Sequence, residues 1–189
     1  MAGTVDVPLE AVTAEAFEPF GALIAEPLAP PVFRNPGLRS WRFPYEASAA
    51  TDLMVIRYDH RPMTFAKLER HNNVTQCFIP LDSMPWVMAV AAPGGSGEDP
   101  APEGVRAFLV GGEQGILMWK GTWHAFNRFP AAPPGASFAL LTGADTQAEL
   151  EERMTGGPPP TLTHVVDYAE RSGLSFRIVD PRGLLTAEG

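Results

Sequence analysis

The sequence predicts an all-β protein whose strands are mainly antiparallel. Its 18 glycines and 20 prolines make up about 20% of the 189 residues, against roughly 12% in an average protein, which indicates many turns. Seven short candidate strands follow one another, and no long helix separates them. Runs of strands without intervening helices favour an antiparallel sandwich or a small barrel over a parallel sheet with crossover helices.

The first expected element is a short helix near the N-terminus. Thr13 is suited to cap a helix that runs from Ala14 to Phe20, with its apolar side chains on one face. Gly21 then stands where a left-handed C-terminal cap is expected. Four prolines between positions 27 and 36 predict irregular chain until about Arg39.

The strands are expected in quick succession after this segment. Apolar runs bounded by turn residues identify them. They span residues 53–58, 64–71, 76–81, 86–92, 105–110, 115–119 and 137–142. The length of the chain favours one domain, which we expect to comprise residues 1–143, the N-terminal helix included.

The character of the chain changes at about Ala144. A charged helix is expected from Thr146 to Met154. A final strand is expected from Leu174 to Val179. We expect this strand to pair either with a sheet edge or with a partner subunit. We therefore expect residues 144–189 to form an extension of the domain and not an independent domain.

Charge and cysteine content exclude several classes of function. The net charge of −8 disfavours a surface for nucleic acid or an anionic membrane, although a local basic pocket can still bind a small acid. Cys77 is the only cysteine, so an intramolecular disulfide cannot form, and its thiol is expected to pack within a strand. The first residues lack a basic start, and the longest apolar stretch is about half a membrane span, so we expect a cytoplasmic location.

The strongest constellation of polar residues lies in the second expected strand and the strand after it. Residues i and i+2 of a strand face the same side, so Glu69 and His71 project together. Arg70 points to the opposite face, where we expect it in an exposed interface or a salt bridge. After a turn, Gln76 and Phe78 return on the interior face. Burying a carboxylate without a partner is costly, which favours a satisfied functional network here.

A second group of candidate residues follows a later strand. His124 comes after a glycine-broken strand, and a barrel can bring it opposite His71. Lys120 is either a solvated turn residue or the cation that receives a substrate carboxylate. The other two histidines, His60 and His164, are expected at the surface or hydrogen-bonded in the core.

Several short motifs occur in the order in which one known family has them. They are Leu68-Glu69-Arg70-His71, Gln76 with Phe78-Ile79-Pro80, Val105-Arg106-Ala107-Phe108, Gly112-Glu113-Gln114-Gly115 and Gly121-Thr122-Trp123-His124. With them the sequence resembles the ureidoglycolate lyase family, formerly called ureidoglycolate hydrolase. Leu9 to Ile24 is similar to the opening helix of that family, and the resemblance covers roughly residues 7–142.

The resemblance implies a fold, a reaction and a set of residues. Family members are cupin-like: their fold is a double-stranded β-helix, or jelly-roll barrel, and they are commonly homodimers. They cleave ureidoglycolate, a small carboxylic acid, to glyoxylate and urea in the allantoin branch of purine catabolism, which is a lyase reaction of the amidine-lyase type. Catalysis is thereby implied for Glu69, His71, Lys120 and His124, and substrate binding for Gln76, Phe78, Gln114, Trp123 and Asn127.

Two segments resemble the cupin motifs that hold a metal ion. They are Glu69-x-His71 followed by Gln76, and Gly121-x-x-His124-x-x-Asn127. The resemblance implies a divalent transition metal, nickel or a similar ion, held by Glu69, His71, Gln76 and His124. Gln76 is a neutral ligand where cupins usually supply a carboxylate, which lowers the expected affinity. We expect no organic cofactor.

Departures from the family pattern leave the substrate open. Ala125 and Phe126 stand where the family commonly has a second histidine and a proline, and the usual closing segment is replaced after residue 142. Two alternatives therefore remain. One is a related cupin enzyme that acts on another small hydroxy or oxo acid, and the other is a cupin that binds a metabolite without turnover.

Overall fold

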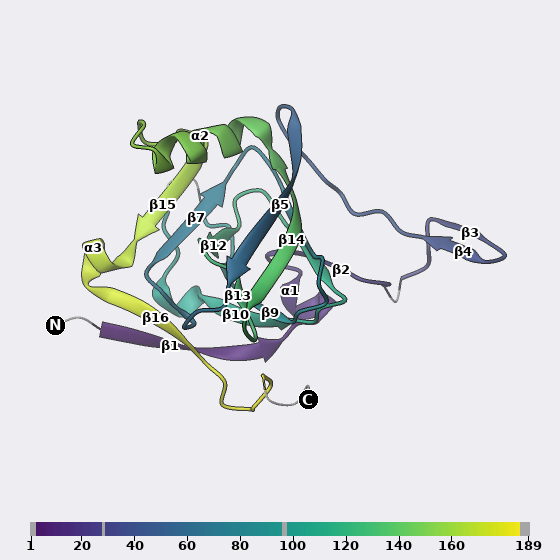
Figure 1. The fold of residues 1–189 in the computed structure, drawn as a ribbon, viewed down its shortest axis with the longest axis horizontal. Helices are drawn as coiled ribbons and strands as arrows, with labels where there is room; N and C mark the ends of the chain where they lie inside the picture. The colour runs from purple at the N-terminus through teal and green to yellow at the C-terminus, as the bar shows by residue number, and fades with distance from the viewer. Residues whose placement is uncertain (1–2, 28, 96–97, 186–189) are drawn as a thin grey trace.

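The computed structural model describes residues 3–27, 29–95 and 98–185, and its strands form two large, curled β-sheets and one small hairpin (Figure 1). The larger sheet has the spatial order β15 (Thr163–Asp167), β7 (Lys67–His71), β12 (Trp123–Ala125), β9 (Trp86–Ala91), β10 (Arg106–Val110), β1 (Gly3–Ala11), β16 (Leu174–Val179) and β6 (Thr64–Phe65), with β13 (Phe129–Pro130) on β9. The smaller sheet has the order β2 (Gly21–Ile24), β11 (Gly115–Met118), β8 (Gln76–Pro80), β14 (Gly135–Gly143) and β5 (Thr51–Asp59). Pairing is antiparallel except where β1 meets β10 and β16. The predicted all-β, mainly antiparallel barrel is confirmed.

Helices are short and lie at the ends of the barrel. They are α1 (Ala14–Phe17), α2 (Ala144–Met154), α3 (Tyr168–Ser172) and a single 3-10 turn at Pro102–Gly104. Thr13 caps α1 as predicted, because its hydroxyl accepts the hydrogen bond of the Ala16 N–H at 3.0 Å. α2, with 11 residues, is the longest helix of the described chain, and no helix there is long and apolar enough to cross a membrane.

Both faces of the larger sheet are buried at its central strands β9 and β12. One face meets the smaller sheet across the barrel interior, where the inner core includes Phe78, Met88 and Phe108. The opposite face forms an outer core with residues of the tail, among them Tyr168 and Phe176. Alternation on β9 shows the division, since Met88 faces the inner core and its neighbours Val87 and Ala89 face the outer one. Side chains on either face of these central strands are therefore withdrawn from water.

The C-terminal tail supplies two strands of the larger sheet. β15 pairs with β7, and β16 pairs with β1 and β6 (Figure 1). The final strand has the predicted bounds, Leu174–Val179, and it joins a sheet of its own chain. These pairings place the tail directly beside the strand that carries Glu69 and His71.

The structure corrects three predictions in the N-terminal third. β1 was not expected, and the proline-rich segment contains the hairpin of β3 (Phe33–Asn35) and β4 (Leu38–Ser40). α1 ends at Phe17, and Gly21 is no left-handed cap but the first residue of β2. A Cβ at Gly21 would lie 2.0 Å from the carbonyl oxygen of Leu117, so the glycine permits the close approach of β2 to β11.

Candidate metal centre

Glu69, His71 and His124 converge in the barrel interior. Glu69 and His71 lie on β7, and His124 lies opposite Glu69 on the paired strand β12. The Nδ1 atom of His124 is 3.7 Å from Oε1 of Glu69, and the two imidazole centroids are 5.3 Å apart. Each residue offers a ligand atom, and these three atoms lie within 4.8 Å of one another. The predicted meeting of these side chains is observed.

Strand alternation explains why these residues share a face. Positions 69 and 71 of β7 face the interior together, and the intervening Arg70 points to the outer core. Arg70 is only 4% exposed there, and its guanidinium lies 4.6 Å from the ring centroid of Trp123. Arg70 points outward as expected, but the outer core made with the tail covers this face of the sheet, and none of the salt bridges among the described residues includes Arg70.

Several buried atoms of the cluster have no hydrogen-bond partner among the described residues. They are Oε2 of Glu69, Nε2 of His71, Nε2 of His124 and Oε1 of Gln76. The amide nitrogen of Gln76 donates to Oγ1 of Thr142 at 3.1 Å, which identifies the oxygen as its free end. Unpaired buried polar atoms are costly, and a bound cation would satisfy all four of these. One carboxylate, two imidazoles and an amide oxygen suit a divalent transition metal.

Burial determines the protonation of the cluster. It raises the pKa of Glu69 to about 7, and the positive charge of Arg128 acts in the opposite direction. Burial also lowers the pKa of His71 to about 4 and holds the pKa of His124 well below its usual value, and Arg128 reinforces both effects. Both imidazoles are therefore neutral at pH 7, which is the form that binds a metal or accepts a proton.

The Nδ1 atoms of both histidines have neighbours that fix the rings. Nδ1 of His71 lies 2.9 Å from the hydroxyl oxygen of Thr163 on β15, and Nδ1 of His124 lies 3.3 Å from the carbonyl oxygen of Ala125. A carbonyl oxygen only accepts, so the Ala125 contact places the proton of His124 on Nδ1 and leaves its Nε2 free. The Thr163 hydroxyl can donate or accept, so it fixes the orientation of the His71 ring. Sequence reasoning missed Thr163, since nothing near it predicts that a tail strand pairs with β7.

A crevice that is too tight to hold a water molecule lies against the cluster. It is lined by His71, Val74, Gln76, Met118, Trp119, Thr122 and His124. Trp119 also lines the neighbouring pocket, which contains Lys120 and Glu46. Nζ of Lys120 lies 3.1 Å from a carboxylate oxygen of Glu46, so Lys120 is an ion-paired residue beside the cluster's pocket and not a member of the cluster.

The structure places the other predicted binding residues away from this pocket. Phe78 is buried in the inner core, and Trp123 is buried in the outer core. The side-chain oxygen of Gln114 accepts a hydrogen bond from the N–H of Gly111 within its own turn. The oxygen of Asn127 accepts one from Arg61. Direct substrate contact by these four residues stays a prediction without geometric support, whereas Gln76 lines the pocket.

Arg128 is a buried cation that sequence reasoning missed. Its guanidinium lies 4.1 Å from the ring centroid of Phe78, and one of its nitrogens donates to the carbonyl oxygen of Ala125 at 2.7 Å. Its positive charge lowers the pKa of all three cluster residues, Glu69, His71 and His124. The only sequence feature that could have indicated a buried arginine is its place in an otherwise uncharged stretch from residue 121 to 134. A surface position would explain this feature equally well.

The sequence comparisons with known proteins point to one family. The family model described as ureidoglycolate lyase matches residues 4–159. The ureidoglycolate lyase of Azotobacter vinelandii is 35% identical over 125 residues, 61% of this chain and 73% of the relative. That of Rhodobacter capsulatus is 32% identical over 152 residues, 76% of this chain and 90% of the relative. Among solved structures, RmlC from Streptococcus suis in complex with dTDP-D-xylose is similar over 50% of this chain and 43% of that chain, at 8% identity and a TM-score of 0.30.

The family match extends beyond the motifs that the sequence shows by eye. It reaches through α2 to residue 159, whereas those motifs end near residue 142. It also includes all three residues of the buried cluster, Glu69, His71 and His124. The chain belongs to the ureidoglycolate lyase family.

Proposed function

We propose that this protein cleaves ureidoglycolate to glyoxylate and urea. The family match coincides with a buried cluster of Glu69, His71 and His124, and this cluster carries the proposal. A carboxylate and two neutral imidazoles supply the proton transfers, or the metal ligands, that this reaction needs. The family match favours ureidoglycolate over other small hydroxy or oxo acids, and the acid and base groups favour turnover over binding alone.

The reaction breaks one carbon–nitrogen bond. The central carbon of ureidoglycolate carries a hydroxyl group, a carboxylate and a urea nitrogen. Removal of the hydroxyl proton lets the oxygen form a carbonyl with this carbon, and the electron pair of the carbon–nitrogen bond moves to the nitrogen. That nitrogen takes up a proton and leaves as urea. The site must therefore accept one proton and donate one proton at neighbouring atoms.

The protonation states of the cluster suit these two tasks. The imidazoles of His71 and His124 are neutral at pH 7, so their free Nε2 atoms can accept the hydroxyl proton. Glu69 has a pKa of about 7, so a large fraction of its carboxyl groups carries a proton that can pass to the leaving nitrogen. Arg128 keeps the pKa of Glu69 from rising further and so keeps this proton mobile.

The same atoms fit a divalent cation. Glu69, His71, His124 and the amide oxygen of Gln76 would hold it, since their free ligand atoms are buried without other partners among the described residues. When bound, such an ion supplies Lewis acidity that lowers the pKa of a substrate hydroxyl and neutralises a carboxylate. Metal binding and proton transfer use the same Nε2 and carboxylate atoms, so the metal content of the active protein decides which role they have.

Lys120 is our candidate for the residue that binds the substrate carboxylate at the mouth of the site. Its ammonium group pairs with Glu46 on a segment that faces Trp119, and Trp119 connects its pocket to that of the cluster. A substrate carboxylate can replace the Glu46 carboxylate at this ammonium group. We further propose a cytoplasmic homodimer as the working form.

Incubation of the purified protein with ureidoglycolate tests the function. We expect equimolar glyoxylate and urea, each measured by its own assay. Folded, metal-replete protein that releases neither product overturns the proposal. Prolonged chelation followed by metal analysis tests the metal separately: loss of turnover that returns with one divalent ion supports it, and full turnover of metal-free protein removes the metal from the reaction.

A further inference from the structure

The hairpin of β3 and β4 extends away from the barrel as an arm, residues 32–42 (Figure 1). Its two strands pair only with each other among the described strands. The arm touches its own chain near its base, where Arg39 pairs with Glu26 and the indole of Trp41 donates to the carbonyl oxygen of Ala29. A two-stranded hairpin alone is marginally stable in water, so this arm needs a further surface to hold it.

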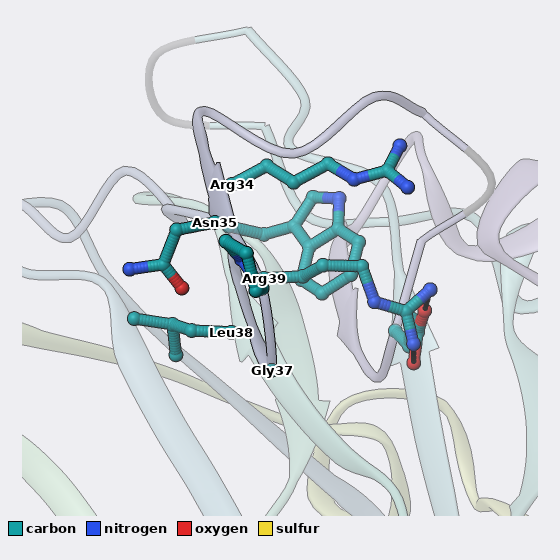
Figure 2. Close-up of a pocket in the computed structure, with 8 residues that line it drawn as sticks. Arg34, Asn35, Gly37, Leu38 and Arg39 are labelled. Carbon is teal, nitrogen blue, oxygen red and sulfur yellow. Dashed lines mark hydrogen bonds and ion pairs between the residues drawn. The ribbon is translucent and has the colours of Figure 1, made fainter.

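The arm has one apolar face and one basic face. The side chains of Arg34 and Arg39, opposite each other in the pairing, point to one side, and those of Asn35 and Leu38 point to the other (Figure 2). Phe33 shares the side of Leu38 by alternation, and the two are 53% and 50% exposed. Glu26 pairs with Arg39, so Arg34 is the arginine of this opposed pair that is left to meet an acidic partner surface.

The outer face of the smaller sheet offers a matching apolar surface. Leu53 and Val55 on β5 are 75% and 73% exposed, and Ile79 on β8 is also exposed. Register places Val55 and Ile79 on either side of Ala139, so these side chains form a continuous row across β5, β14 and β8. We call this row, with the neighbouring Leu53 and Leu81, the sheet patch. Contiguous exposed apolar patches mark sites of protein association.

Charge distinguishes the arm from the rest of the chain. The arm contains Arg34, Arg39 and Arg42 and no acidic residue. The whole chain has a net charge of −8, so the remainder carries −11. Exposed Asp59 at the end of β5 and exposed Asp82 after β8 flank the sheet patch, together with Arg57, which pairs with Asp59 at 3.7 Å. The basic arm is therefore complementary in charge to the acidic remainder of the chain.

We propose that the arm of one protomer docks on the sheet patch of a second copy of this chain. Each chain carries both surfaces, so a two-fold axis lets both arms and both patches be covered at once. This proposal names the interface of the homodimer proposed above, on which it rests, and it is independent of the proposed reaction.

The docked arm would also bear on the substrate pocket. The chain returns from the arm through Pro44 and Glu46, which line the pocket of Lys120. Glu46 is fastened there by backbone and hydroxyl hydrogen bonds with Thr75. An arm held by the partner would therefore keep one wall of that pocket in place.

Light scattering coupled to size-exclusion chromatography tests the interface without any measurement of activity. We expect the full chain to have twice the mass of the 20.4 kDa monomer. Phe33→Asp on the arm and Val55→Asp on the sheet patch should each raise the dimer dissociation constant at least tenfold, with unchanged circular dichroism. Met154→Asp, at an exposed apolar residue of α2, is the matched control and should remain dimeric.

A wild-type chain that stays monomeric at 100 µM overturns the proposal, since the arm then docks on no second copy. A dimer that survives both substitutions overturns it as well, because the subunits then meet elsewhere. If one variant fails to fold, the other variant still shows whether the arm and the sheet patch form the interface. Added salt should weaken the wild-type dimer because the complementary charges are exposed.

Discussion

The hydroxyl oxygen of Thr163 lies 2.9 Å from Nδ1 of His71, which joins the C-terminal tail to the candidate metal centre. Thr163 and His71 are direct partners in the pairing of β15 with β7. The family match ends at residue 159, so this contact comes from a part of the chain outside it. The tail thus orients a central residue of the site as well as covering the barrel.

Thr163→Val should weaken the centre without unfolding the protein. Valine keeps the shape of the side chain and removes the partner of Nδ1, so the ring of His71 loses the hydrogen bond that orients it. Loss of such a supporting hydrogen bond typically costs 10–100-fold in metal affinity or activity. Titration with nickel or another divalent ion checks this directly, and Thr163→Ser should restore most of the affinity. Equal affinity in wild type and Thr163→Val would contradict a positioning role.

Glu69→Gln should change how the stability of chelated protein depends on pH. The pKa of Glu69 is about 7 in the folded protein and near 4.5 in the unfolded chain, so the folded state binds more protons between these values. Its contribution to the free energy of unfolding therefore falls as pH rises from about 4.5 to 7, by about 3 kcal/mol in total. Glutamine does not titrate, so this fall is absent from the variant.

Urea unfolding of chelated wild type and Glu69→Gln at pH 5 and pH 8 measures this difference. The variant should gain about 3 kcal/mol relative to wild type between the two pH values. Both proteins keep His71 and His124, whose pKa values are lowered, so both proteins lose stability below about pH 6.5. This loss cancels in the difference between the two proteins, which leaves the contribution of Glu69. Exposed Glu113→Gln is the control and should show a constant difference. A constant difference for Glu69→Gln as well would show that Glu69 ionises normally.

Arg128→Met should shift the protonation of the buried histidines. Methionine fills much of the space over Phe78 but carries no charge, so the repulsion that Arg128 exerts on protonated imidazoles disappears. The pKa of His71 should rise from about 4 toward its ordinary value. NMR titration of the histidine ring signals in chelated protein measures it. An unchanged or lower pKa would mean that Arg128 does not act electrostatically on the cluster.

Lys120→Met should raise KM with a smaller effect on kcat. The ammonium group is expected to bind the substrate carboxylate, and an ion pair at a partly exposed site contributes about 1 kcal/mol, or roughly fivefold in binding. Steady-state kinetics with ureidoglycolate checks this, with Lys67→Met as the control because Lys67 pairs with Asp167 on the tail. Unaltered KM in Lys120→Met would assign Lys120 a purely structural pairing with Glu46.

Local sequence was enough to predict the strands and part of the site. Alternation on one strand predicts that Glu69 and His71 share a face, and a barrel brings His124 opposite them. Strand bounds were close as well, since the expected 76–81 is observed as Gln76–Pro80. These features depend on residue spacing within a single strand, which the sequence shows directly.

Features that depend on long-range pairing could not be predicted. Arg70 was expected at the surface because its neighbours in sequence do not reveal the outer core that covers it. The contact of Thr163 with His71 joins residues 92 positions apart, and the register of β15 on β7 is visible only in the folded sheet. Gly21 resembled a helix cap, yet its role is set by the backbone of Leu117.

The central claim is that the buried cluster of Glu69, His71 and His124 carries the reaction. The most direct test compares the rate of glyoxylate formation in His124→Ala with that in His164→Ala. His124 is buried in the cluster, whereas His164 lies exposed on β15. We expect His124→Ala to retain its fold by circular dichroism and to lose at least a hundredfold in kcat/KM, and His164→Ala to match wild type. Wild-type turnover in folded His124→Ala would contradict the assignment of the reaction to this cluster.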